Sequence, residues 1–256
     1  MNYTDITVQS SGSVATISIS REAHRNALRS TTIHELTQCF TSLGANPAIR
    51  SIILRGAGTK AFCAGADLSE LQSNNDPNNR RAFFGTIATL ITSMRECPKP
   101  IISTVYGYAL AGGLGLVAAS DIVLATPDAV FGLPEVKIGL GPLVVMEPLS
   151  RVMNQRALSR LVMTGERITA AEALAAGLLT EITDSSTIEA RGLEYATTIA
   201  ANAPEAVQQT KLCLQSLPGT SIEELADLSA LRSLSKEATE GISAFNEKRR
   251  PHWSTR

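Results

Sequence analysis

Two short stretches of the sequence share a pattern that suits the binding of an oxygen atom that gains negative charge. Residues 62–68 read FCAGADL and residues 110–116 read LAGGLGL, and in each an apolar strand end is followed by Ala-Gly, a small residue and a helix. The first N–H groups of a helix have no acceptor within it, and small side chains let a ligand approach the backbone closely. Two such N–H groups aimed at one point would form an oxyanion hole for a thioester whose carbonyl oxygen gains charge as an enolate forms. The alternative is that both stretches are only close-packed turns.

The second stretch also fits the formula of a dinucleotide-binding loop. Gly113, Gly115 and Ala118 match G-x-G-x-x-A, a predicted strand precedes them, and Glu135 follows as a downstream acid. Two features count against NAD binding. The strand predicted over residues 101–107 ends several residues before the first glycine of the motif, and Glu135 lies in a Gly-x-Pro-Glu turn rather than at a strand end. We therefore favour the oxyanion site over the dinucleotide loop.

Composition argues against several other classes of function. The formal net charge of −1 gives no global field for nucleic acid or an acidic membrane. The four cysteines are scattered without a CxxC pair, which indicates reduced thiols in a cytoplasmic protein rather than disulfides or a zinc site. The N-terminal segment has neither the basic nor the apolar region of a signal peptide, and the apolar runs are too short to span a membrane.

The elements that must position the two stretches can be predicted from hydrophobic periodicity. Alternating apolar and polar residues predict paired strands, and short apolar runs predict buried ones. The strands are expected over residues 6–9, 14–20, 51–56, 101–107 and 121–126. A helix is expected from about Ser30, and its apolar face would consist of Ile33, Leu36, Phe40 and Leu43. Another helix is expected over residues 80–96, after a polar turn at residues 74–79 (NNDPNN).

Capping signals predict further helices. Four pairs have the spacing of a capping box, in which two side chains close a helix N-terminus: Asp67 with Glu70, Thr169 with Glu172, Ser186 with Glu189, and Ser221 with Glu224. Pro204 suits the first turn of another helix. Strands thus alternate with helices in the first two thirds of the chain, and from about residue 145 helices dominate. This order predicts an α/β protein with a helical C-terminal part.

Taken together, these segments resemble the crotonase superfamily, also called the enoyl-CoA hydratase/isomerase family. The similarity runs over nearly the whole chain and includes RNAL at 25–28, KAFCAGADL at 60–68, KPIISTVYGYALAGGLGL at 99–116, FGLPEVKIGL at 131–140, MTGERITAAEA at 163–173 and EGISAFNEKRRP at 240–251. The resemblance implies a spiral of ββα units over residues 1–195 and a C-terminal helical trimerisation region over residues 196–256. It also implies a homotrimer or a dimer of trimers, and an acyl-CoA substrate with no metal and no cofactor beyond that coenzyme A.

The resemblance also implies roles for individual residues. Ala66 and Gly112 would supply the two oxyanion N–H groups, and Glu135 would be a catalytic glutamate. On the residues alone, Glu135 could equally be an acid stabilised by the dipole of a helix that begins at Pro134. The resemblance places further coenzyme contacts at His24, Arg25, Ala64, Leu68, Phe245 and Lys248, the last two often from a neighbouring subunit.

One position departs from the family pattern. The first catalytic glutamate of a hydratase would fall at Gly115. A single carboxylate still suits double-bond isomerisation, because one base can take a proton from C2 of a 3-enoyl thioester and return it at C4. Isomerisation is therefore favoured slightly, while hydration, decarboxylation, thioester hydrolysis and a non-catalytic acyl-CoA-binding role stay open. Glu147, an acid further along the chain, is expected to be solvated or salt-bridged rather than catalytic.

Overall fold

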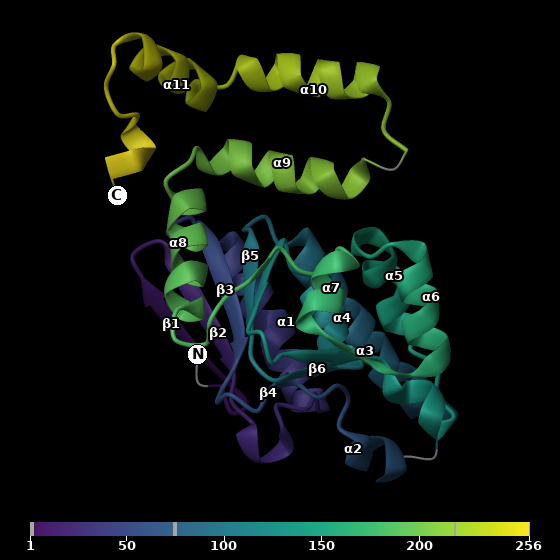
Figure 1. Cartoon of the computed structure of the whole chain (residues 1–256). Coiled ribbons are helices and arrows are strands. Elements are labelled where there is room, and N and C mark those ends of the chain that lie inside the picture. The colour runs from purple at the N-terminus through teal and green to yellow at the C-terminus, as the bar shows by residue number, and fades with distance from the viewer. Residues whose placement is uncertain (1–2, 74–75, 218, 256) are drawn as a thin grey trace.

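The computed structural model describes residues 3–73, 76–217 and 219–255, and its first sheet starts from the N-terminal hairpin (Figure 1). Strands β1 (Ile6–Ser11) and β2 (Val14–Ile19) pair antiparallel, and Gly12 turns the chain between them with a φ of 57°. The next strands all add in parallel: β3 (Ser51–Gly56), β5 (Ile101–Val105), β7 (Ile122–Ala125) and β10 (Glu181–Ile182). Within the described residues the order is β1-β2-β3-β5-β7-β10.

Helices cover both faces of this sheet, so its central strands β3 and β5 are almost entirely buried. Leu54 of β3 belongs to the main core, to which α1 (Ser30–Ala45) and α3 (Pro77–Glu96) contribute. Its neighbour Ile53 points to the opposite face and joins a smaller cluster with residues of α8 (Ile188–Ala200). A strand buried on both faces needs a continuous apolar run, and residues 52–54 (IIL) supply one at the centre of β3.

A second sheet of very short strands lies beside the first. Strands β4 (Ala61–Cys63), β6 (Tyr108–Leu110) and β8 (Val130–Gly132) are parallel neighbours, and β9 (Arg167–Thr169) pairs antiparallel with β8. The remaining helices of the body are α2 (Leu68–Ser73), α4 (Gly112–Ala118), α5 (Leu143–Val152), α6 (Gln155–Thr164) and α7 (Ala170–Ala175). All residues of α4 are buried.

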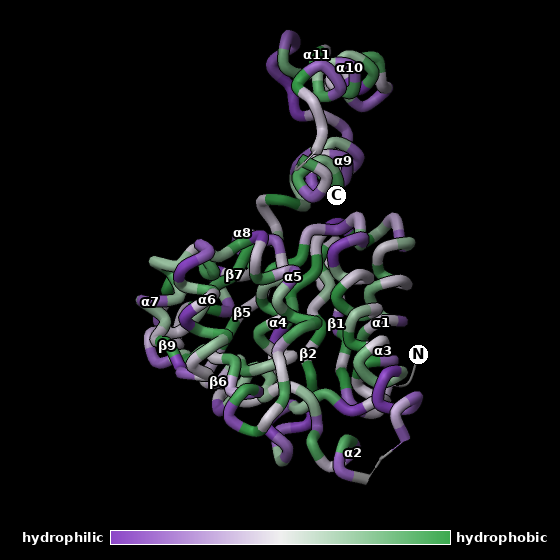
Figure 2. The backbone as a smooth tube through the Cα atoms, turned by 90° about the vertical axis from the view of Figure 1, so that its right-hand side faces the viewer, coloured by the Kyte–Doolittle hydropathy of each residue, from purple (hydrophilic) through white to green (hydrophobic). Residues whose placement is uncertain are grey.

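The last three helices form an arm that stands away from the body. Figures 1 and 2 show α9 (Pro204–Ser216), α10 (Ile222–Ser233) and α11 (Lys236–Asn246) beyond the end of α8. One buried cation ties α9 to the body: the Lys211 ammonium lies 2.8 Å from a carboxylate oxygen of Asp121 and donates to the carbonyl of Lys99 at 3.0 Å. Helix α8 runs through residue 195 and packs on the sheet through Ala196. The predicted boundary between a core over residues 1–195 and a helical region over residues 196–256 stays a prediction.

Most of the predicted elements are confirmed. The paired N-terminal strands, the buried strands and the helix with its apolar face at Ile33, Leu36, Phe40 and Leu43 are all present. The capping boxes at Thr169 and Ser221 form as predicted, and Pro204 opens α9. All four cysteines are free. None of the described helices has the length and apolarity that crossing a membrane would require.

Three details of the predicted helix N-termini were wrong. Helix α3 begins at Pro77, with Asp76 as its cap, because the Asp76 carboxylate accepts from the N–H groups of Asn78 and Asn79. The expected polar turn is therefore partly helical, and residues 74–75 lie outside the described residues.

The other two errors concern capping pairs. Helix α2 does begin directly after Asp67, as predicted. Asp67 and Glu70 do not close a capping box, since the Asp67 N–H donates to Leu28 and the Glu70 carboxylate accepts from Ser30. Ser186 does not cap α8, whose N-cap residue is Thr187.

Candidate active site

Three neighbouring parallel strands deliver the expected site residues to one edge of the second sheet. After β4 the chain runs through Ala64 and Ala66, after β6 it reaches Gly112, and after β8 it reaches Glu135. The carboxyl ends of parallel strands point the same way, so the segments that follow them meet. An N–H of Ala111 that donates to the Gly132 carbonyl at 2.9 Å joins two of these segments directly.

These segments enclose an apolar cavity of about 240 Å³. Its walls come from the strand ends, from α2 and α3, and from the segment that leads into α5. Among the described lining residues, Glu135 alone has a polar side chain; the others are Ala64, Ala66, Leu68, Leu71, Phe84, Ile87, Ala111, Gly112, Pro134, Ile138, Leu140, Gly141, Pro142, Leu143, Val144 and Val145. The cavity therefore suits an apolar group and offers one ionisable side chain to it.

The backbone N–H groups of Ala66 and Gly112, which both line the cavity, lack acceptors among the described residues. The two groups are close, because a Cβ built on Gly112 would lie 3.7 Å from the Ala66 nitrogen. A Cβ on Gly65 would lie 2.5 Å from the Cβ of Ala111, so the two loops touch where the N–H groups emerge. Paired free donors beside an apolar cavity are the arrangement that stabilises an oxyanion.

The backbone at this point is held in an unfavourable conformation. Ala111, the N-cap residue of α4, has φ 50° and ψ −125°. Residues with a Cβ rarely adopt positive φ, and such conformations persist only where the surrounding structure enforces them, often at functional sites. Here the sharp bend turns the chain from β6 directly into α4, and Gly112, the first residue of α4, lines the cavity.

Glu135 is a half-buried acid with one buried carboxylate oxygen that has no partner. It lies in a 3₁₀ turn over Pro134–Ile138 that ends at Gly139, which has a φ of 76°. Its Oε2 atom is buried and has no hydrogen-bond partner. Loss of solvent raises the pKa of Glu135 above its ordinary value of 4.5, and a hydrogen bond from its own main chain opposes this only in part. A carboxylate of this kind is suited to proton transfer.

The glycines of the dinucleotide formula face protein atoms rather than open space. A Cβ on Gly113 would lie 2.3 Å from the Cys63 carbonyl oxygen, and one on Gly115 would lie 2.5 Å from Cγ1 of Val145. Both residues are glycine because α4 packs closely on β4 and α5. The geometry thus gives no support to NAD binding at this loop, and Val145 fills the space next to Gly115.

Four of the six expected coenzyme contacts do not line the cavity. His24 and Arg25 are exposed beside the turn Glu22–His24, and Arg25 borders a separate cleft with Lys60 and Tyr108. Phe245 and Lys248 lie on the C-terminal arm. Ala64 and Leu68 do line the cavity with the three proposed catalytic positions. The functional roles of all these residues stay predictions.

Glu147 is salt-bridged, as predicted, with Arg95 and Arg151, and it does not line the cavity. Among the described residues, no group of three His, Cys, Asp or Glu side chains is arranged to hold a metal ion.

Asn26 was missed by the sequence reasoning. It is buried, adopts a φ of 55°, and donates through its amide to the carbonyls of Ala57 and Ala61. It thereby anchors the segment on which the Ala66 loop rests. Its place in R-N-A-L was the available signal, because asparagine tolerates positive φ better than most residues.

Comparisons with known proteins agree with this geometry. The family described as "Enoyl-CoA hydratase/isomerase" matches residues 9–256. A short-chain-enoyl-CoA hydratase of Clostridium acetobutylicum is 34% identical over 213 residues, which are 82% of this chain and 81% of that protein. A carnitinyl-CoA dehydratase of Proteus mirabilis is 32% identical over 255 residues, 96% of each chain. The crystal structure of an enoyl-CoA hydratase from Shewanella pealeana superposes with a TM-score of 0.91 at 32% identity, covering 98% of this chain and 96% of that one.

Proposed function

Because the chain belongs to the enoyl-CoA hydratase/isomerase family, we propose that it processes an enoyl-CoA thioester through an enolate. The Ala66 and Gly112 N–H groups hold the thioester oxygen as it gains charge, and Glu135 moves the proton. These roles are supported by the site, in which the N–H groups of Ala66 and Gly112 have no acceptor and a buried carboxylate oxygen of Glu135 has no partner, beside an apolar cavity.

Double-bond isomerisation is the reaction that this site favours. Glu135 removes a proton from C2 of a 3-enoyl thioester, the electrons move into a dienolate whose oxygen rests on the two N–H groups, and the same carboxyl group returns the proton at C4. The observation that carries the proposal is that Glu135 alone contributes a polar side chain to the described cavity lining. A second acid, which would help to hold an attacking water, is replaced by Gly115 with Val145 against it.

Hydration of a 2-enoyl thioester is the second candidate. It is favoured by the names of the relatives, one a hydratase and one a dehydratase. In this reaction Glu135 alone would have to orient the water, because Glu147 is engaged by two arginines outside the cavity. Decarboxylation and thioester hydrolysis would use the same oxyanion site with other substrates.

A turnover screen with matched variants separates these candidates. We expect purified protein to isomerise 3-hexenoyl-CoA faster than it hydrates crotonyl-CoA, and Glu135→Gln to lower isomerisation by roughly two to four orders of magnitude. Glu147→Gln is the control, because it also removes an acid but one outside the cavity. Fast hydration that survives Glu135→Gln would contradict the assignment, and coenzyme A binding without any turnover would indicate a non-catalytic binding subunit.

We also propose that the chain works as a homotrimer or a dimer of trimers. The arm exposes many apolar side chains, including Leu214, Ile222, Leu231, Leu234, Ile242 and Phe245. The coenzyme would then be contacted by His24 and Arg25 of one subunit and by Phe245 and Lys248 of a neighbour. We propose no cofactor other than the coenzyme A of the substrate. The four free cysteines suit the reducing conditions of the cytoplasm.

A further inference from the structure

The loop that carries the Ala66 N–H is held from behind by a neighbouring segment. The N–H of Leu28 donates to the Gly65 carbonyl at 2.8 Å, and the N–H of Asp67 donates to the Leu28 carbonyl at 2.9 Å. The Gly65 carbonyl and the Ala66 N–H belong to one trans peptide unit, in which they point in opposite directions. Since Leu28 binds the carbonyl side, the N–H must face away from it. The direction of the Ala66 N–H therefore depends on how firmly this peptide unit is held.

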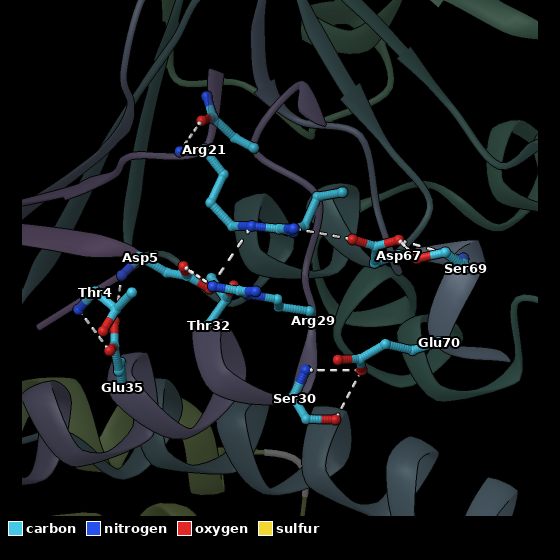
Figure 3. A network of polar contacts seen from close by, with 12 residues as sticks. Thr4, Asp5, Arg21, Arg29, Ser30, Thr32, Glu35, Asp67, Ser69 and Glu70 are labelled. Atoms are coloured by element: carbon cyan, nitrogen blue, oxygen red, sulfur yellow. Dashed lines mark hydrogen bonds and ion pairs between the residues drawn. The ribbon is translucent and has the colours of Figure 1, made fainter. Parts of the chain in front are cut away.

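Arg21 binds both of the segments that meet at this contact. The Arg21 guanidinium donates through one nitrogen to the Ala27 carbonyl and through the other to a carboxylate oxygen of Asp67 at 3.0 Å, as Figure 3 shows for Asp67. The exposed fraction of the side chain is only 8% for Arg21 and 15% for Asp67. The two donor nitrogens are held in one rigid plane, so they fix the position of Ala27 relative to Asp67, which the single ammonium of a lysine does not do.

The two carboxylate oxygens of Asp67 have different hydrogen-bond partners. One binds Arg21, and the other accepts from the N–H and the hydroxyl of Ser69 in the first turn of α2 (Figure 3). Asp67 directly follows Ala66, so fixing its side chain limits rotation of the peptide units on either side of Ala66. The pKa of Asp67 is lowered mainly by the Ser69 hydrogen bond and also by Arg21, which keeps the carboxylate charged for this pairing.

A second ion pair continues the network but does not touch the loop. Asp5 lies 3.7 Å from Arg21 and accepts two short hydrogen bonds from Arg29, at 2.6 and 2.7 Å. Arg29 thus shares the buried carboxylate partner of Arg21 without a bond to residues 64–67. The Arg29–Asp5 pair offers a matched control, because a substitution of Arg29 perturbs the same network of charges without removing a bond to the Ala66 loop.

We propose that Arg21 and Asp67 are positioning residues that set the direction of the Ala66 N–H. This inference rests on the proposed function, in which that N–H holds the thioester oxygen. Replacing Arg21 by lysine keeps the charge but loses the fork that joins Ala27 to Asp67. The peptide unit of Ala66 then gains freedom, and the hydrogen bond to the substrate oxygen lengthens while the apolar cavity and the coenzyme contacts remain.

The experiment uses bound acetyl-CoA labelled at the carbonyl carbon, which reports the oxyanion site whatever the reaction. In wild type we expect the carbonyl stretching frequency to fall on binding, as seen by isotope-edited infrared difference spectroscopy. Arg21→Lys should lose most of this shift and lower kcat by roughly 10- to 100-fold, with KM changed by less than about threefold. Arg29→Lys should keep both the carbonyl shift and kcat, even if it lowers the unfolding midpoint as much as Arg21→Lys does.

The outcomes are distinguishable. If wild type shows no carbonyl shift, the oxyanion site itself is wrong and the proposed function fails with it. If wild type shows the shift and Arg21→Lys retains it together with full kcat, only the positioning role is overturned. Should Arg21→Lys not fold, Asp67→Asn decides the matter, since it removes the charge of the less buried partner and keeps its shape: a weakened shift supports the role, and an unchanged shift with unchanged kcat refutes it.

Discussion

At the scale of single residues, the burial of Glu135 makes a signed prediction about pH. Its pKa is raised in the folded protein by loss of solvent, so the folded state binds the proton more tightly than the unfolded state does. Stability from this group is therefore complete below its ordinary pKa of 4.5 and is lost as the pH rises through the higher folded value. Glu135→Gln should consequently be more stable than wild type at pH 8, and this advantage should disappear near pH 4.

Chemical denaturation of both proteins at several pH values measures this difference directly. Wild-type kcat/KM should rise over the same pH window, because the carboxyl group must lose its proton to act as the base. A difference in unfolding free energy that does not change with pH would show that Glu135 has an ordinary pKa and that the cavity does not desolvate it.

At the scale of elements, the close contact of α4 with α5 makes a prediction about Gly115. A Cβ at this position would lie 2.5 Å from Cγ1 and 3.1 Å from Cβ of Val145, a β-branched residue that has little freedom to move. Gly115→Ala should lower the free energy of unfolding by about 1–3 kcal/mol. The matched control is Gly85→Ala in α3, where a Cβ would meet nothing within 4 Å and alanine should be neutral or stabilising.

A double-mutant cycle identifies the cause. If Val145 is the obstacle, Gly115→Ala combined with Val145→Ala should cost less than the sum of the two single substitutions. For the same reason Gly115→Glu alone is not expected to create a working second carboxylate, since the larger glutamate side chain would also collide with Val145. Additive costs would mean that Val145 is not what keeps position 115 small.

The elements also show where sequence reasoning succeeds and where it stops. Apolar runs such as SIILRG and the motifs FCAGADL and LAGGLGL predicted buried strands and the segments that follow β4 and β6, because these signals are local. The strand β8 has only three residues, too few for periodicity to indicate, so the second sheet was not predicted. The pairing of Arg21 with Asp67 joins residues 46 apart, and Glu70 binds Ser30 rather than its own helix start. Such contacts depend on tertiary packing that no local pattern encodes.

At the scale of the whole molecule, the C-terminal arm leaves more apolar surface exposed than a monomer needs. Leu231 is 67% exposed, Leu234 80% and Phe245 83%, and these three lie on or beside helices that stand away from the body (Figure 2). Large exposed apolar side chains gathered on one part of a chain are typical of an interface, and closed symmetry is the usual result when copies of one chain associate. We expect light scattering at micromolar concentration to give a mass of three or six times 27.1 kDa.

Charges placed on the arm should break this assembly. Leu231→Glu with Leu234→Glu puts unpaired carboxylates into the expected interface, which costs several kcal/mol per subunit contact in such settings. The double variant should lower the measured mass while the far-ultraviolet circular dichroism stays unchanged, because both side chains project from α10 or its end without contributing to the core. Met163→Glu, at a residue 72% exposed on α6 of the body, is the control and should leave the mass as it was. A wild-type monomer, or a double variant that assembles as wild type does, would show that the arm is not the interface and that the coenzyme contacts expected from a neighbour's Phe245 and Lys248 must be sought elsewhere.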